Sequence, residues 1–190
     1  MLKQYIVLTL FTIATLAHSN IAKTPDHHAI KNLFQNFHDA TQKVTHLQLY
    51  VQDILSGPNP TNIPVATANS TLTSPTLFGL TAVLDDPIRT GPNPDSEIVG
   101  RAQGLLTFAS LEELSLHMTF HLVFTSGQYN GSTLSLVGYN PYLRESRELP
   151  VVGGSGAFRL ARGVALIRTV SFDATTGDAF FQYNVTVLHY

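Results

Sequence analysis

The clearest structural signal in the chain is the segment Leu116-His-Met-Thr-Phe-His-Leu-Val-Phe124. Apolar side chains occupy every second position from Leu116 to Phe124, and His117, Thr119 and His121 lie between them. Because successive side chains of a strand point to opposite faces, this period of two indicates a half-buried β-strand. The segment therefore predicts one face packed in a core and one face in water.

The same period recurs on both sides of this segment. The positions concerned are Leu47, Leu49 and Val51, then Val164, Leu166, Val170 and Phe172, and finally Tyr183, Val185 and Val187. Turn clusters rich in Gly, Pro, Asn and Asp separate the runs, at residues 56–60, 85–87, 90–94, 126–127, 130–131 and 176–178. About eight strands at hairpin spacing, with no helical pattern between them, predict one all-β domain over residues 45–190, an antiparallel barrel or sandwich.

The composition excludes several classes of protein. Of the 190 residues, 13% are charged and 44% are hydrophobic, which excludes a disordered chain. The formal net charge of −2 argues against a nucleic-acid-binding protein. The chain has no Cys, so disulfides, iron–sulfur clusters, zinc–thiolate sites and thiol nucleophiles are excluded.

The N-terminus predicts secretion. Residues 1–19 combine Lys3, a short apolar run and small residues before the expected cleavage point after Ser19, as in a signal peptide. Residues 20–44 are expected to form a leader that is partly helical at most. No later segment is long and apolar enough for a membrane span, so no membrane association is expected. N-glycosylation sequons begin at Asn69, Asn130 and Asn184, in agreement with an extracellular glycoprotein. Secretion without disulfides favours a closed sheet.

Two charged residues share the parity of apolar runs. Asp53 continues the alternation of residues 47–51, so its carboxyl is expected on the apolar face, where desolvation raises a pKa toward the range of a general acid. The alternative interpretation is that Asp53 caps the turn at residues 54–57. Arg168 lies in the run 164–172, and the simpler interpretation there is a side chain that extends to solvent at a barrel rim.

Other site chemistries do not fit the pattern. His117 and His121 would lie roughly 13 Å apart on a strand, which disfavours a shared metal ion. The segment Gly153-Gly-Ser-Gly156 lacks the Gly-Lys-Ser/Thr ending of a phosphate loop. The chain has no Gly-x-Ser-x-Gly motif, and no Ser/His/Asp arrangement is evident. No metal site, nucleotide site or hydrolytic triad is predicted.

Several motifs, in order along residues 47–190, resemble the plant dirigent proteins. The segments concerned are Asp53-Ile-Leu-Ser-Gly57, Val99-Gly-Arg-Ala-Gln-Gly104, Tyr129-Asn-Gly-Ser-Thr-Leu134, Arg147-Glu-Leu-Pro-Val-Val-Gly-Gly-Ser-Gly156, Phe158-Arg-Leu-Ala-Arg-Gly163 and Tyr183-Asn-Val. The resemblance implies an eight-stranded antiparallel β-barrel that is secreted to the apoplast, glycosylated and assembled as a homo-oligomer, a trimer or a dimer.

The resemblance also implies the kind of chemistry. Most members hold two phenoxy radicals, made by a separate laccase or peroxidase, so that the radicals couple with one handedness. A related branch, the pterocarpan synthases, dehydrates and cyclises an isoflavan-4-ol. Both routes pass through a quinone methide, and neither uses a cofactor. Because stereodirection is the most common role in the family, we expect this function first and a lyase activity as the alternative. The third alternative is a passive carrier of hydrophobic ligands.

Site residues carry over from the resemblance position by position. Asp53 matches the acid at the end of the first barrel strand, and Arg147 matches the arginine beside the lumen, so both are expected to be catalytic. The second acid of lignan-forming members falls at Asn140, and their aromatic hydroxyls fall at Leu106 and Phe108.

These three positions, with the flanking Tyr139 and Tyr142 as replacement hydroxyls, form the expected substrate-binding set. The loss of polar groups at three positions weakens the expectation of lignan coupling. An intramolecular closure needs one acid, and Asp53 can supply it.

Overall fold

The structure, a computed structural model, describes residues 27–190. The described residues 27–39 belong to one unit, which contains helix α2 (His27–Gln35) and the 3₁₀ turn η2 (Phe37–Asp39). The predicted signal peptide, residues 1–19, lies outside the described residues, and so does the start of the predicted leader. Among residues 27–190, no helix is long and apolar enough to cross a membrane.

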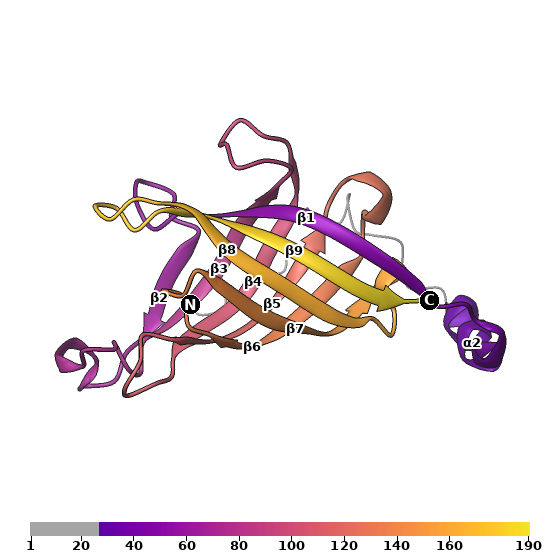
Figure 1. The fold of residues 1–190 in the computed structure, drawn as a ribbon, viewed down its shortest axis with the longest axis horizontal. Coiled ribbons are helices and arrows are strands. Elements are labelled where there is room, and N and C mark those ends of the chain that lie inside the picture. The colour runs from indigo at the N-terminus through magenta and orange to yellow at the C-terminus, as the bar shows by residue number, and fades with distance from the viewer. Residues whose placement is uncertain (1–26) are drawn as a thin grey trace, which may run out of the picture. The chain divides into compact units, whose positions relative to one another are not determined.

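Residues 40–190 form the second unit, an antiparallel β-sheet closed into a barrel (Figure 1). Its strands are β1 (Lys43–Asp53), β2 (Asn62–Ala66), β3 (Thr81–Arg89), β4 (Ile98–Phe108), β5 (Leu116–Phe124), β6 (Thr133–Asn140), β7 (Ser146–Ser155), β8 (Arg162–Phe172) and β9 (Ala179–His189). Short 3₁₀ turns lie in its connections: η3 (Thr71–Thr73), η4 (Gly127–Tyr129) and η5 (Gly156–Phe158).

Closure of the sheet produces the predicted eight-stranded barrel. The strand order is β1-β9-β8-β7-β6-β5-β4-β3-β2, and β1 also pairs with β3 through Tyr50 opposite Arg89 and Val51 opposite Ile88. The cylinder therefore consists of β1 and β3 to β9. The short β2 is a ninth strand, paired with β3 beside the point where β1 and β3 meet.

The core fills the barrel with the side chains that the alternation predicts. In β5 the five apolar positions from Leu116 to Phe124 are buried, and His117, Thr119 and His121 are exposed. The inward positions Tyr183, Val185 and Val187 of β9 are buried as well. Burial of these side chains is the main favourable contribution to the stability of a fold without disulfides.

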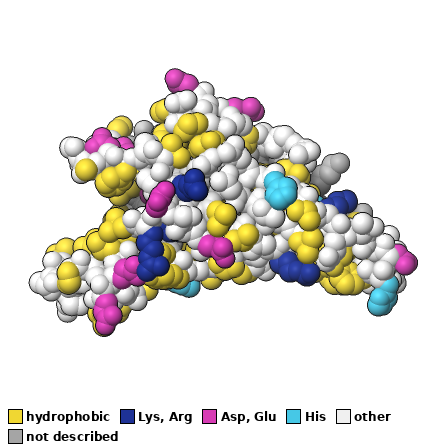
Figure 2. Space-filling model, viewed as in Figure 1, with side chains coloured by type: hydrophobic (Ala, Val, Ile, Leu, Met, Phe, Trp, Pro, Cys, Tyr) yellow, Lys and Arg dark blue, Asp and Glu magenta, His cyan; other side chains and the backbone are white. Residues whose placement is uncertain are grey.

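The parity predicted for β8 is wrong. Ala165 and Ile167 are the buried residues, whereas Leu166, Val170 and Phe172 are 44%, 47% and 63% exposed. The register explains this result, because Ile167 lies opposite the inward-facing Tyr183 and must share its face. Arg168 lies on the outer face and is exposed. The face of the molecule in Figure 2 carries many other hydrophobic side chains, so apolar parity alone does not identify the inner face of a strand.

The turn predicted at residues 85–87 is also wrong, because these residues lie inside β3. A proline removes a donor from a β-ladder, so its place in a strand needs a reason. The N–H of Asp85 donates to Thr61 O at 2.8 Å, and two residues later the nitrogen of Pro87 faces the same side. That side is where the partner of β3 changes from β2 to β1, so no ladder bond is lost there.

Candidate functional site

Charged and polar side chains gather inside one end of the barrel. Asp53 ends β1, Asn140 ends β6, and Arg147 lies near the start of β7; antiparallel pairing brings these strand ends to the same side. Asp86 joins them, because extending the register of Val51 opposite Ile88 leads to Asp53 beside Asp86. We call these four residues, with Tyr183 of β9, the polar cluster.

Asp53 faces the interior, as its parity predicts. One carboxyl oxygen, Oδ1, is buried and has no hydrogen-bond partner among the described residues. The turn that follows β1 is capped by a different acid: Asp178 accepts from the N–H groups of Leu55 at 2.8 Å and Ser56 at 3.0 Å. Capping of the turn, the alternative interpretation of Asp53, therefore falls to Asp178. A pocket of about 340 Å³ adjoins Asp53, and the ends of β1, β8 and β9 contribute to its wall.

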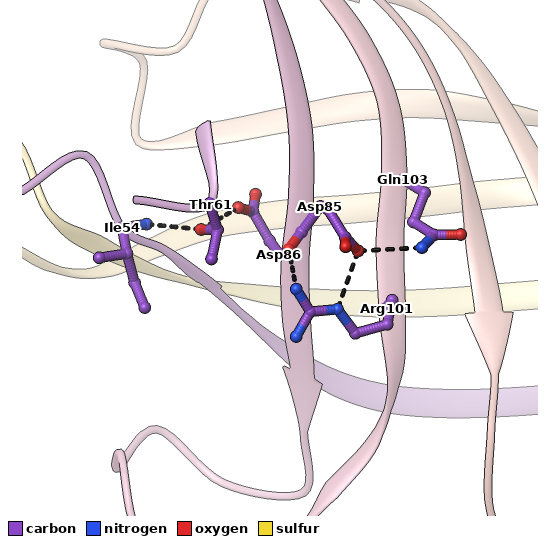
Figure 3. Close-up of polar contacts among 6 residues, drawn as sticks. All are labelled: Ile54, Thr61, Asp85, Asp86, Arg101 and Gln103. Carbon is purple, nitrogen blue, oxygen red and sulfur yellow. Dashed lines mark hydrogen bonds and ion pairs between the residues drawn. The ribbon is translucent and has the colours of Figure 1, made fainter. Parts of the chain in front are cut away.

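Adjacent residues at the start of β2 hold the two acids of the polar cluster. The Thr61 hydroxyl donates to Asp86 Oδ1 at 2.6 Å and accepts the Ile54 N–H at 3.1 Å (Figure 3). The side-chain amide of Asn62 donates to Asp53 Oδ2 at 3.3 Å. Because the Ile54 N–H occupies one lone pair of Thr61, the hydroxyl proton is free to point at Asp86.

Asp85 and Asp86 are neighbours with opposite environments. Figure 3 shows the Asp85 carboxyl turned toward Arg101 and Gln103, which donate to its Oδ1 at 2.8 and 3.0 Å. The hydrogen bond and charge of Arg101 lower the pKa of Asp85. Asp86 faces the other way and is 4% exposed. Because successive side chains of a strand point to opposite faces, two adjacent residues carry one solvated and one buried carboxyl.

Burial raises the pKa of both interior acids. The pKa of Asp53 rises to about 6, chiefly through desolvation; the Asn62 hydrogen bond opposes this, and the charge of Asp178 adds to it. The pKa of Asp86 rises to about 8, again chiefly through desolvation, with repulsion from Asp53 second. Two carboxyls this close do not readily ionise together, so the pair keeps a proton through neutral pH. That proton makes the pair a candidate general acid.

Arg147 supplies the positive charge of the polar cluster. It is 3% exposed, and its Nη1 donates to Thr169 Oγ1 at 2.9 Å and to Arg144 O at 3.1 Å. The guanidinium lies 5.6 Å from the ring centroid of Phe181, and its Nε has no partner among the described residues. Desolvation lowers the pKa of Arg147, yet a guanidinium stays charged in proteins. A buried donor without an acceptor suits an oxygen-bearing ligand.

Tyr183 is near enough to the two acids and to Arg147 for the charges of all three to affect its pKa. Its pKa is raised above that of a free tyrosine, first by complete burial and then by the charges of Asp86 and Asp53, while Arg147 acts in the opposite direction. The ring makes an edge-on contact with Phe120, at 6.2 Å between centroids. Tyr183 therefore remains a neutral phenol in the lumen.

The remaining wall of this end is mostly apolar. Leu106 is 6% exposed, and Phe108 meets Tyr142 edge-on at 6.0 Å. Asn140 is buried with its Nδ2 3.0 Å from Met118 Sδ, and its Oδ1 has no partner among residues 27–190. Tyr142 is half-buried, and desolvation raises its pKa. The structure thus brings these four predicted residues to the same end of the barrel as Asp53 and Arg147.

Tyr139 does not join them. It is 51% exposed on the outer face of β6, where its hydroxyl donates to the carboxylate of Glu113. This facing is opposite to the one required for a substrate-binding residue of the lumen. The predicted glycosylation residues Asn69, Asn130 and Asn184 are all exposed, which is compatible with the prediction but does not test it.

Sequence reasoning did not identify Asp86 or Tyr183 as site residues. Asp86 shares its parity with Leu84 and Ile88, the same signal that singled out Asp53, but Pro87 made the segment look like a turn. Tyr183 has the parity of buried residues, which does not distinguish a functional phenol from a packed ring. Among residues 27–190, no three His, Cys, Asp or Glu side chains are grouped so as to hold a metal ion.

Comparisons with known proteins agree with this barrel. A family model described as dirigent-like protein matches residues 44–188. Dirigent protein 21 of Arabidopsis thaliana is 49% identical over 147 residues, which cover 77% of this chain and 78% of that protein. Pterocarpan synthase 1 of Glycyrrhiza echinata is 43% identical over 150 residues, which cover 78% and 80%. A solved structure of a pterocarpan synthase dirigent protein aligns with a TM-score of 0.73 and 45% identity, over 78% of this chain and 96% of that one.

Proposed function

The chain belongs to the dirigent-like protein family, and on this basis we propose that it removes water from an isoflavan-4-ol and closes a new ring. The observation that carries the proposal is the pair of interior acids, Asp53 and Asp86, whose carboxyls are buried and which the register of β1 and β3 places beside one another. Burial raises the pKa of both, which favours a proton shared by the pair. A buried proton donor is what the departure of a hydroxyl group requires. Arg147 lies in the same polar cluster and supplies a cation for a phenolic oxygen.

The reaction balances without an oxidant. The substrate's phenol para to the carbinol carbon releases its proton to water, and Arg147 binds the resulting phenolate. The acid pair donates its proton to the carbinol hydroxyl, the C–O bond breaks, water leaves, and the phenolate becomes a quinone methide. A second phenol of the substrate adds to the same carbon, its proton returns to the acid pair, and the ring oxygen is again a phenolate, which regains a proton from water as the product leaves. One substrate yields one cyclic product and one water.

Two acids with separated pKa values fit this cycle. Asp86 is the more deeply buried carboxyl, and repulsion from Asp53 raises its pKa further, so the pair holds a proton that it can donate. Leu106, Phe108 and Tyr142 provide an apolar wall for the aromatic rings. The relatives named pterocarpan synthase support this choice, and it reverses the order of the two activities expected from sequence.

The second candidate function is stereodirection of phenoxy-radical coupling, with a laccase or peroxidase as the separate source of radicals. The unpaired Nε of Arg147 and the adjacent Phe181 favour it, because they suit a phenolic ring whether or not a proton is transferred. This function needs no proton donor before coupling, so it leaves the raised pKa of Asp86 without a role in the first step.

One experiment separates these functions. The protein is incubated with a 2′-hydroxylated isoflavan-4-ol without oxidant, and with monolignols and laccase, and the products are resolved by chiral chromatography. The proposal expects cyclisation without oxidant, reduced about 100-fold or more in Asp53→Asn and in Asp86→Asn. Asp85→Asn is the matched control, since it removes the neighbouring carboxylate from the outer face.

The outcomes are distinct. Full activity of both Asp53→Asn and Asp86→Asn would contradict the acid mechanism. An enantiomeric excess that arises only with laccase would support stereodirection instead. Binding of phenols without any change of product or rate would identify a carrier.

We further propose that the protein is an extracellular, N-glycosylated homo-oligomer. The exposed sequons support glycosylation, and the exposed apolar side chains of β8 support association. Enzymatic deglycosylation followed by mass spectrometry, and light scattering of the purified protein, test the two parts separately. An unchanged mass after deglycosylation would contradict the first part, and a monomer mass by scattering would contradict the second.

A further inference from the structure

An ion-pair network ties together two loops beside the polar cluster. Glu113 lies in the loop between β4 and β5, and its carboxylate accepts from Arg144 Nη2 at 2.9 Å. The same carboxylate accepts a hydrogen bond from the hydroxyl of Tyr139 on the outer face of β6. Arg144 belongs to the loop between β6 and β7. Glu113 thus links one loop both to a strand and to the next loop.

The backbone of Arg144 continues this network to the interior. Its carbonyl oxygen accepts from Arg147 Nη1 at 3.1 Å, and its N–H donates to Pro141 O at 2.9 Å, which forms a turn. Arg147 Nη1 also donates to Thr169 Oγ1 at 2.9 Å. The guanidinium therefore contacts two neutral oxygens and a ring, and one of those oxygens belongs to a loop that Glu113 restrains.

The environment of Arg147 makes it sensitive to that restraint. Among residues 27–190 the ion pairs join Arg101 to Asp85 and Arg144 to Glu113, so no carboxylate fixes the Arg147 guanidinium directly. A hydrogen bond to a carbonyl is lost when the loop moves by about an ångström, because its strength falls steeply with distance and angle. The orientation of the free Nε then changes as well.

We propose that Glu113 is a positioning residue, which sets the orientation of Arg147 through Arg144 and so controls how the phenolic oxygen is held. The inference rests on the proposed function for its kinetic consequence, but the geometry of Arg147 can be measured without any substrate. Tyr139 has a part in the same network: it fixes Glu113 against β6, which gives this outward-facing residue a role outside the lumen.

A single exposed ion pair contributes little to the free energy of unfolding. If Glu113 only stabilised the loops, its removal would cause a small change in melting temperature and nothing else. Positioning predicts more. In Glu113→Ala the kcat for the isoflavan-4-ol should fall about tenfold at nearly unchanged KM, because the lost contact orients the group that holds the phenolate in position for loss of the hydroxyl. Glu113→Gln should recover part of the loss, since its amide oxygen can still accept from Arg144, although the hydrogen bond from Tyr139 to the second carboxylate oxygen is lost.

The direct test is the side-chain Nε–H signal of Arg147 in ¹⁵N-labelled protein, identified by its disappearance in Arg147→Lys. We expect it to shift, and to exchange faster with water, in Glu113→Ala and in Arg144→Gln. Glu112→Ala is the matched control: it removes the same charge from the adjacent position of the same loop and should leave the signal unchanged.

An Arg147 signal in Glu113→Ala and Arg144→Gln identical to that of the wild type would overturn the inference. Circular dichroism establishes that each variant is folded. A wild-type protein inert toward isoflavan-4-ols would count against the proposed function, while the Arg147 signal would still decide the positioning role.

Discussion

The hydroxyl of Thr61 donates a hydrogen bond to Asp86 Oδ1 at 2.6 Å, so the segment that leads into β2 holds the buried acid of β3. The bond stabilises the ionised carboxylate and lowers the pKa of Asp86, against the larger effect of burial. The second oxygen of the carboxyl is left to carry the transferable proton. Thr61 therefore helps to orient this acid and partly offsets the effect of burial on its pKa.

Replacing Thr61 by Val should raise the pKa of Asp86 further. In a plot of kcat/KM against pH, the decrease on the alkaline side is then expected at higher pH than in the wild type. The maximum value of kcat/KM should be lower, because the carboxyl is no longer oriented. The lost bond should also reduce the free energy of unfolding by about 1 kcal/mol. pH–rate profiles and urea titrations check the two parts. Thr61→Ser, which keeps the hydroxyl, is the control, and an alkaline decrease of Thr61→Val at the wild-type position would contradict the assignment.

The stability of the barrel should fall as the pH rises from about 4 to about 8. In this window the unfolded acids, with an ordinary pKa of 3.8, have released their protons, whereas Asp53 and Asp86 still hold theirs until about 6 and about 8. The folded state then binds more protons than the unfolded state, which makes the slope of stability against pH negative. Urea titrations at several pH values measure it.

Asp86→Asn removes a large part of this slope. Each unit of pKa shift corresponds to about 1.4 kcal/mol, so the variant should be more stable than the wild type at pH 8 by at least that amount. At pH 4 the two proteins should differ little. Asp85→Asn, whose carboxylate is ionised and paired in the fold, should not gain stability at pH 8. Equal slopes for Asp86→Asn and the wild type would show that Asp86 is not a protonated acid in the fold.

Arg147→Lys should lower kcat/KM for the phenolic substrate by tenfold or more. A lysine keeps the charge but loses the planar guanidinium, which reaches Thr169 and Arg144 O and packs over Phe181. Steady-state kinetics under one buffer condition are sufficient. The control is Arg168→Lys on the outer face of β8, for which the wild-type value is expected. Retention of full activity in Arg147→Lys would remove the proposed phenolate-binding role.

Asn140→Leu should stabilise the free protein and weaken ligand binding. Asn140 Oδ1 is buried without a partner in the described part of the chain, and such an unpaired group costs about 1–3 kcal/mol. The substitution removes that cost, but it also removes an acceptor from the lumen. Thermal unfolding and calorimetric titration with a non-reactive isoflavan measure the opposing effects. A variant that is less stable and binds as tightly as the wild type would contradict the prediction.

Strand positions could be predicted where one face of a strand is uniformly apolar. The segment 116–124 met this condition, and its burial follows the predicted alternation residue by residue. β8 did not, because its interior positions are filled by the small Ala165 and by Ile167 while larger apolar side chains lie outside. Only the register against β9 identifies the inner face of β8, and register depends on pairing between segments distant in sequence.

The candidate site was predictable to the extent that it depends on parity. Asp53 was found through its position after three alternating apolar residues. Asp86 has the same signal and was missed, because the adjacent Pro87 made the segment look like a turn. Pro87 fits into β3 at the point where the neighbouring strand changes from β2 to β1, and local sequence does not reveal that change. The outward facing of Tyr139 depends on the register of β6 with its neighbours. The hydrogen bonds of Thr61 and Asn62 arise from a loop whose path has no sequence signature.

Closure between β1 and β3 rests on two residue pairs in the described chain, against the eleven residue pairs that join β1 to β9. Transient separation of strands therefore breaks fewest hydrogen bonds along this seam, which runs beside both interior acids. Amide hydrogens that are donated across this seam, between β1 and β3, should be among the first of the barrel to exchange with deuterium. Opening of this seam would give planar molecules a lateral route to the interior acids while the other strand pairs stay intact.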